Sequence, residues 1–211
     1  VSPHTRRITH RRKRMPRIAR MYVKGSNAAY HVISRTALDG FVLGAVEKEK
    51  LLKIFKWMSS VYFVEVTGFC IMDNHFHFLI ETVEDGGTIS RIMQYIKARI
   101  AEICNKALNR RGPFWNERFK DVIVEEQENP LVYLLWLLWY IAFNPVKAGK
   151  CSDPRNYKYS SILFYLVEEV KSKVTIIRHR CFEELGETFS ERVKRFLFYE
   201  EAYRKRYALL F

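Results

Sequence analysis

The sequence predicts an α+β fold, in which an antiparallel sheet carries helices on one face and a helical tail follows. Hydrophobic residues make up 48% of the 211 residues, which is enough for one packed core. Patterns of strand period and of helix period alternate along the chain in the order β, α, β, β, α, β, α. This order is that of the split βαβ, ferredoxin-like arrangement.

A strand, a helix and a hairpin open the predicted fold. Extended structure begins near Ala29 with "YHVISRT", and residues 61–72 and 75–82 form two strands joined by a tight turn at Asp73-Asn74. Residues 46–60 form a helix, because apolar residues recur there at helical spacing: Val46, Leu51, Ile54 and Phe55.

A second helix, a short strand and a third helix follow. After "EDGG", Thr88 or Ser90 can cap a helix over residues 89–108. The stretch "RRGPFWNERFKDVIVEE" predicts a turn and short extended segments. Asn129-Pro130 opens the third helix, which ends near Phe143 because the next residue but one is a proline.

The two ends of the chain differ from this middle region. Residues 1–20 carry eight Arg or Lys residues and no acidic residue, which predicts a flexible basic arm. Residues 1–14 are an upstream extension if "MPR" marks the natural start. Residues 21–150 form the main domain, and residues 151–211 form a loop and a helical tail.

The charge of the sequence favours a polyanionic partner. The formal net charge is +13 and the isoelectric point is about 9.7. Such an excess of cations is typical of proteins that bind nucleic acid. The alternative is a basic protein without such a partner.

The cysteines and the hydropathy pattern indicate a cytoplasmic protein without a membrane partner. The four cysteines are far apart and form no CxxC pair, which argues against a zinc knuckle or a disulfide framework. No apolar run reaches the roughly 18 residues that a membrane helix needs. No hydrophobic segment follows the charges near the N-terminus, as it would in a secretory signal.

The stretch "IMDNHFHFLI" places two of the six histidines one residue apart. Because side chains alternate between the faces of a strand, His75 and His77 share one face. Phe76, Phe78 and Ile80 share the other. Two imidazoles at this spacing can bind one divalent ion if a third ligand comes from elsewhere. The alternative is a pair of ordinary sheet histidines.

The helix after Asn129 offers that third ligand. One stripe of this helix carries residues at spacings of four, three and four: Tyr133, Leu137, Tyr140 and Asn144. A buried amide must find polar partners, so the Asn144 oxygen can complete a metal shell with the Tyr140 hydroxyl one turn away. The alternative is that Tyr140 is a core residue and Asn144 only a helix terminus.

This set of ligands indicates phosphoryl chemistry. Two imidazoles, an amide oxygen and open coordination positions suit Mg²⁺ or Mn²⁺ better than structural zinc. The ion would polarise a phosphodiester while a tyrosine attacks phosphorus and forms a covalent phosphotyrosine. A free phenol has a pKa of about 10, so the metal and nearby basic groups would have to activate it.

A basic, aromatic stretch is the predicted DNA-binding surface. Cations and aromatic rings alternate in "RRGPFWNERFK", a combination typical of single-strand binding. Its candidate residues are Arg110, Arg111, Phe114, Trp115, Arg118 and Lys120. Arg17 and Arg20 of the basic arm are candidates for the same role. The alternative is an ordinary turn with Trp115 in the core.

Three further residues carry less weight. His31 of the first strand could border the histidine pair, but a sheet histidine with satisfied hydrogen bonds is the preferred interpretation. Tyr133 is a second candidate nucleophile, although no ligand-type residue lies four positions on. Tyr95 lies on a different helix.

Taken together, the motifs resemble a known family. "YHVISR", "MDNHFHFLIE", "FWNERFKDVIVEE" and "YIAFNPVKAG" occur in the order seen in the IS200-like, single-tyrosine HUH transposases. More narrowly, they resemble the REP-associated tyrosine transposase branch. HUH denotes histidine, a hydrophobic residue and histidine, here His75-Phe76-His77. The resemblance covers residues 17–165, and the combination of motifs is far more specific than the histidine pair alone.

The resemblance implies a role for each matching residue. His75 and His77 correspond to the two metal-binding histidines of the family. Tyr140 corresponds to the nucleophile that cleaves single-stranded DNA and becomes joined to the 5′ phosphate. Asn144 corresponds to the polar residue that completes the Mg²⁺ or Mn²⁺ site. The chain departs from the family pattern at Phe76, where a small aliphatic residue is commoner.

We therefore expect a metal-dependent transposase that cuts and rejoins single-stranded DNA at hairpin-bearing element ends. A first alternative is a domesticated protein of the same fold that binds DNA or RNA without cleaving it. A second, a two-histidine phosphodiesterase, needs duplicated His-x-Thr/Ser motifs, whereas the sequence offers only His179-Arg180-Cys181. The sequence leaves open a monomer or a homodimer, and so whether Tyr140 meets the histidines of its own chain.

Overall fold

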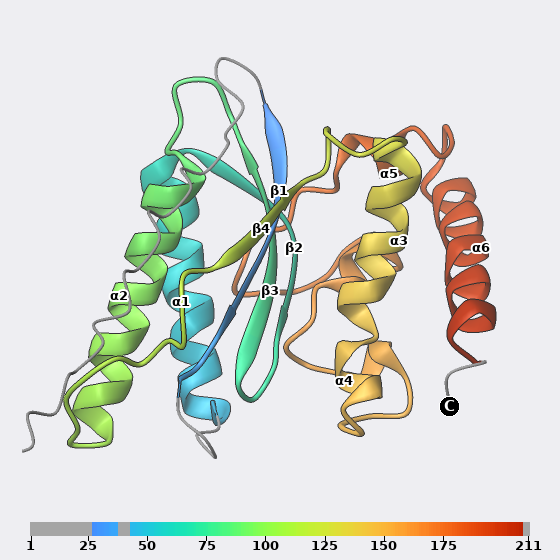
Figure 1. Ribbon diagram of the computed structural model, residues 1–211. Helices are drawn as coiled ribbons and strands as arrows, with labels where there is room; N and C mark the ends of the chain where they lie inside the picture. The colour runs from blue at the N-terminus through green and yellow to red at the C-terminus, as the bar shows by residue number, and fades with distance from the viewer. Residues whose placement is uncertain (1–26, 38–42, 209–211) are drawn as a thin grey trace, which may run out of the picture.

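A four-stranded antiparallel sheet forms the centre of the molecule (Figure 1). The computed structural model describes residues 27–37 and 43–208, so the predicted basic arm with Arg17 and Arg20 lies outside the described residues. The strands are β1 (Ala28–Arg35), β2 (Val64–Ile71), β3 (His75–Thr82) and β4 (Lys120–Ile123), in the spatial order β2-β3-β1-β4. The predicted ferredoxin-like arrangement is confirmed.

The β2–β3 hairpin turns where the sequence predicts it. The Met72 N–H donates to the His75 carbonyl at 2.8 Å, so residues 73 and 74 form the turn. The Asp73 carboxylate lies 2.6 Å from the Lys48 ammonium and also pairs with Lys150. These contacts fix the start of β3, and thereby the face on which each of its side chains lies.

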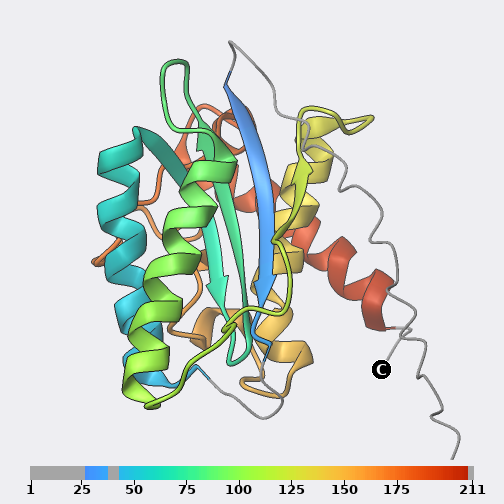
Figure 2. The ribbon, with the colours of Figure 1, turned by 60° about the vertical axis from the view of Figure 1, so that its left-hand side comes forward.

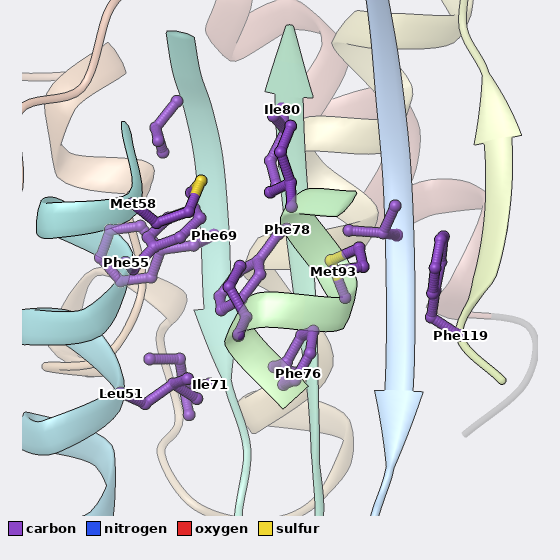
Figure 3. Packing of buried hydrophobic residues seen from close by; sticks show 14 of the residues in the cluster. Leu51, Phe55, Met58, Phe69, Ile71, Phe76, Phe78, Ile80, Met93 and Phe119 are labelled. Atoms are coloured by element: carbon purple, nitrogen blue, oxygen red, sulfur yellow. The ribbon is translucent and has the colours of Figure 1, made fainter. Parts of the chain in front are cut away.

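Helices α1 (Ala45–Tyr62) and α2 (Ile89–Ala107) cover one face of the sheet (Figure 1). Between them and the sheet lies a core of aliphatic and aromatic side chains (Figure 3). The rings of Phe55 and Phe78 stack with centroids 4.1 Å apart. Of the four residues that predict this helix, Val46 alone is exposed. Val46 is 61% exposed, because it lies in the first turn of α1, outside the buried stripe.

Helix α3 (Pro130–Ala142) lies against the other face, where the sequence predicts its stripe to meet the histidines. The Asn129 side chain accepts a hydrogen bond from the Val132 N–H at 3.1 Å and so caps the helix as predicted. The helix ends at Phe143, and a short helix α4 (Asn144–Lys147) begins directly after it.

The C-terminal part of the chain packs against α3 and the edge of the sheet (Figure 2). It contains the short helices η1 (Pro154–Asn156), η2 (Ile162–Tyr165) and α5 (Arg180–Glu183), and the long helix α6 (Phe189–Ala208). The Ile71 N–H donates to the Tyr159 carbonyl, and the Trp139 indole N–H donates to the Phe196 carbonyl. The tail therefore shares one hydrophobic core with α3. Within the described residues, no helix is long and apolar enough to cross a membrane.

Candidate active site

Strand β3 places the two predicted histidines on one face, toward α3. The ring centroids of His75 and His77 lie 5.1 Å apart. Phe76 and Phe78 point to the opposite core, as the alternation predicts. His77 is 2% exposed and His75 is half-buried, so the pair lies beneath α3 rather than on an open surface.

Helices α3 and α4 bring Tyr140 and Asn144 to the same place. The Tyr140 ring meets the His77 ring edge-on, with centroids 5.6 Å apart. The Asn144 amide nitrogen donates to the Tyr140 carbonyl at 2.8 Å, and the Asn144 side chain also hydrogen-bonds His77. All four predicted residues therefore meet within one chain.

His31 of β1 completes this cluster. Its Nε2 lies 3.0 Å from the His77 Nδ1, and the two rings stack with centroids 5.2 Å apart. The sequence favoured an ordinary sheet histidine here, and the structure places His31 in contact with the site. The antiparallel register pairs His31 with Leu79, two residues beyond His77 on the same face. The alternating pattern alone does not give this β1–β3 register, so the sequence does not show that His31 reaches His77.

The three histidines are neutral at physiological pH. Burial lowers the pKa of His31 to about 4. Burial, followed by the charge of Arg35, lowers the pKa of His75 to about 4. Burial also lowers the pKa of His77 well below its usual value, and the neighbouring histidines add to this effect. Their lone pairs are therefore available to accept a hydrogen bond or to bind a cation.

Tyr140 is protonated at neutral pH, and a cation lies beside it. Burial raises the pKa of Tyr140, and Tyr207 raises it further. The Lys147 ammonium lies 5.3 Å from the centre of the Tyr140 ring and donates to the Tyr203 hydroxyl at 2.6 Å. Lys147 follows Tyr140 by two helical turns, so α3 and α4 present the phenol and the cation on one side.

The candidate metal ligands are two imidazoles and one amide. No group of three or more His, Cys, Asp or Glu side chains in the described residues is arranged to hold a metal. An ion bound by His75 and His77 would thus take its third protein ligand from an amide. The Asn144 side chain is the amide in contact with His77.

The predicted DNA-binding stretch lies elsewhere. The prediction that Trp115 binds DNA is wrong, because the residue is only 9% exposed and lies in the core on the α1–α2 side. Its indole N–H donates to the Lys97 carbonyl at 2.8 Å. Its ring is therefore unavailable for stacking on a base. Arg110 donates to the Asn105 side chain at 2.9 Å and bonds the Pro113 carbonyl. The remaining cations are exposed: Arg111, Arg118 and Lys120.

Of the secondary candidates, two lie away from the histidine pair and one lies near Tyr140. Tyr95 stacks on Trp57 with centroids 5.0 Å apart, on the α1–α2 side of the sheet. His179 caps α5, where its Nδ1 accepts from the Cys181 N–H, so it does not join the histidine pair. Tyr133, by contrast, lies near the proposed site, because it and Tyr140 both line a cavity beside α3.

This cavity, the α3–α6 cavity, has a volume of about 700 Å³ and lies between the sheet, α3 and α6. Residues far apart in the sequence line it: His31, Tyr133, Trp136, Tyr140, Tyr203, Arg206 and Tyr207, with the loop residues 127–129 at one end. No chemical role was predicted for the C-terminal tail. The spacing of four between Tyr203 and Tyr207 was a signal that α6 turns one aromatic stripe toward a neighbour.

Comparison with known proteins assigns the chain to a family. The family model described as "Transposase IS200 like" matches residues 24–133, slightly more than half of the chain. The chain belongs to this family. The IS200-like match ends seven residues before Tyr140, so the place of the tyrosine in the site comes from the geometry. A search of curated proteins finds no match.

Two solved structures are similar to this IS200-like transposase. The first is a REP-associated tyrosine transposase bound to a REP hairpin, 18% identical, with a TM-score of 0.61 over 77% of this chain and 95% of that one. At this identity the likeness shows the shared fold. The second is a putative transposase from Deinococcus radiodurans R1, 19% identical, with a TM-score of 0.39 over 51% of this chain and 85% of that one.

Proposed function

We propose that this IS200-like transposase is a metal-dependent endonuclease and strand-transfer enzyme that acts on single-stranded DNA through Tyr140. Its substrates are hairpin-bearing element ends, in line with the REP hairpin bound to the similar solved structure. The cytoplasmic setting predicted from the sequence is part of the proposal. The proposal applies equally to a single chain and to a homodimer.

The observation that carries the proposal is the position of Tyr140. Its ring lies 5.6 Å from that of His77 and 6.1 Å from that of His31 in the same chain. Asn144 links the two sides, because it bonds the Tyr140 backbone and the His77 ring. A nucleophile and a ligand set held this close need no large rearrangement before the reaction.

The proposed step conserves atoms without a co-reactant. The Tyr140 phenolic oxygen attacks phosphorus, a new O–P bond forms, and the bond from phosphorus to the 3′ oxygen breaks. The products are a 5′-phosphotyrosine and a free 3′ hydroxyl, to which the phenolic proton passes by way of solvent. Attack by a 3′ hydroxyl on the phosphotyrosine reverses the step and rejoins DNA.

His75, His77 and Asn144 would hold Mg²⁺ or Mn²⁺. The bound ion would polarise the phosphodiester and neutralise the charge that develops on its oxygens. The histidines, neutral because burial lowers their pKa values, need not lose protons before they bind it. The Lys147 cation beside the phenol favours the charge that develops on the Tyr140 oxygen.

The test is formation of the covalent adduct. Full-length protein with Mn²⁺ is mixed with labelled single-stranded oligonucleotides that carry a hairpin and an unpaired tail, and a denaturing gel detects labelled protein. We expect an adduct with the natural protein and none with Tyr140→Phe. Tyr133→Phe is the matched control, because it removes a neighbouring hydroxyl from the same helix. An adduct that persists in Tyr140→Phe would refute the assignment.

The domesticated, non-cleaving protein is the competing function. It predicts hairpin binding that is the same with Mn²⁺ and with EDTA, and the same in Tyr140→Phe and the natural protein, without any adduct. All four residues of the proposed site are present and assembled, which favours the enzyme.

A further inference from the structure

The walls of the α3–α6 cavity are aromatic. Tyr133 and Trp136 come from α3, and Tyr203 and Tyr207 come from α6. Tyr133 and Trp136 are half-buried and line the cavity, whereas the Tyr207 ring is packed against the Tyr203 ring, with centroids 4.4 Å apart. Base–aromatic stacking tolerates any base because every base has a π face. The cavity is thus suited to flat, unpaired bases.

Two cations lie beside the aromatic rings of the cavity, Arg206 of α6 and Lys147 of α4. The Arg206 guanidinium lines the cavity, 5.7 Å from the Trp136 ring centre, and within the described part of the chain no carboxylate pairs with it. The Lys147 ammonium lies 4.0 Å from the centre of the Tyr207 ring. Glu128 lies at the far end, beyond the start of α3. A phosphate backbone is favoured beside the two cations and disfavoured beside Glu128.

The cavity begins at the nucleophile. Tyr140 is part of its wall, and the opposite end is formed by residues 127–129, about 16 Å away along α3 at the helical rise. This length is several times the roughly 3.4 Å rise between stacked bases. A strand whose phosphate lies at Tyr140 would therefore have its neighbouring nucleotides at the cavity. A duplex keeps its bases stacked on one another, so only unpaired bases can reach the rings.

We propose that the α3–α6 cavity binds the unpaired nucleotides next to the phosphate that Tyr140 attacks. A base stacks on Trp136, and the strand backbone runs along Arg206 and Lys147. The inference rests on the proposed function, because it takes the position of the phosphate from Tyr140. It makes α6 part of the DNA-binding site and distinguishes a single strand from a duplex.

Abasic scanning tests the proposal. The non-cleaving Tyr140→Phe protein is titrated with a labelled oligonucleotide that carries a hairpin and an unpaired tail, with one abasic site moved through the tail. We expect one or two abasic positions to weaken binding by roughly 5- to 150-fold. In the Tyr140→Phe, Trp136→Ala protein, the intact oligonucleotide should bind as weakly as the abasic one, and those positions should no longer matter.

Two variants keep the result interpretable. Trp57→Ala removes a half-exposed tryptophan on the α1–α2 side and should leave the abasic pattern unchanged. Trp136→Phe keeps a ring in the cavity and should retain most of the sensitivity to abasic sites. The loss of that sensitivity in Trp136→Ala is then due to the missing ring and not to misfolding. The proposal is overturned if no abasic position matters, or if the same positions matter equally without Trp136. An adduct at Tyr140 with no such coupling would leave the proposed function intact, whereas coupling without an adduct would remove only the cleavage.

Discussion

The two faces of the sheet are built on the same strands and carry different chemistry. Toward α1 and α2, aromatic and aliphatic side chains pack closely, with Phe76 and Phe78 stacked 4.2 Å apart. Toward α3 lie all four histidines of the described residues, together with the Tyr140 phenol and the Asn144 amide. Across the residues that the structure describes, both faces carry a hydrophobic core, but only the α3 face also buries a cluster of titratable and amide side chains.

The largest expected effect is on stability, when the neighbouring residues Phe78 and His77, which face opposite sides of the sheet, are each replaced by alanine. Phe78→Ala leaves a cavity in the α1–α2 core and should cost about 3–5 kcal/mol of unfolding free energy. His77→Ala should cost less, about 1–3 kcal/mol, because it leaves the buried His31 Nε2 without its partner. Urea unfolding measures both.

Adduct formation should rank the same two variants in the opposite order. At a temperature where both are folded, Phe78→Ala should keep most of the activity and His77→Ala should lose it. Equal loss of activity in both variants would mean that the two faces are not separable.

Acid should act through the α3 face. Burial lowers the folded-state pKa of His31, His75 and His179 to about 4, whereas an unfolded histidine titrates near 6.5. As the pH falls below about 6.5, the unfolded state binds protons first, so stability declines until about pH 4. Each histidine contributes a loss of roughly 1.4 kcal/mol per pH unit within that window.

Urea unfolding at pH 7, 6 and 5 with EDTA present measures this slope. His179→Gln should flatten it by one histidine, because His179 lies near Glu81, away from the proposed metal ligands. A stability that stays flat from pH 7 to pH 5 would contradict the burial of these rings.

The direction of the side chains within a single strand or helix could be predicted from the sequence, because the pattern that sets it is local. Alternation placed Phe76 and Phe78 on one side and His75 and His77 on the other, and the stripe on α3 placed Tyr140 beside Asn144. Each of these predictions uses residues close together in one element, whose periodicity fixes the direction of their side chains.

The remainder of the site depends on contacts between distant elements. His31 meets His77 only through the β1–β3 register, and Tyr203 reaches the cavity only because the chain after α4 returns along the β2 edge. Trp115 lies in a basic, aromatic stretch that is typical of both a DNA-binding surface and a buried turn. Which of the two it forms is decided by α2, whose Lys97 carbonyl accepts its N–H.

A smaller effect should come from His31, which touches His77 without belonging to the predicted ligand set. When His77 binds an ion through one ring nitrogen, the other must be held by a partner, and His31 lies 3.0 Å from it. We expect His31→Gln to weaken Mn²⁺ binding by about 10- to 100-fold, measured by calorimetry without DNA. Ser34→Ala, on the same strand but facing α1 and α2, is the matched control. Equal affinities would show that His31 does not position His77.

The smallest effects compare the helix caps on the two faces. Thr88 caps α2 by accepting from the Arg91 N–H at 3.4 Å, and Asn129 caps α3 with a bond of 3.1 Å. Replacement of either by alanine should cost about 1 kcal/mol, and somewhat less for Thr88, whose bond is longer.

Only the α3 cap should affect the reaction, because α3 carries Tyr140. Thr88→Ala should form the adduct at the natural rate, whereas Asn129→Ala should slow it by loosening the first turn of α3. Asn129 also lines the α3–α6 cavity, and Asn129→Ser separates the two roles, since serine restores the cap but not the amide. Recovery of the rate with serine would assign the effect to the helix, and continued loss would assign it to contact with the DNA.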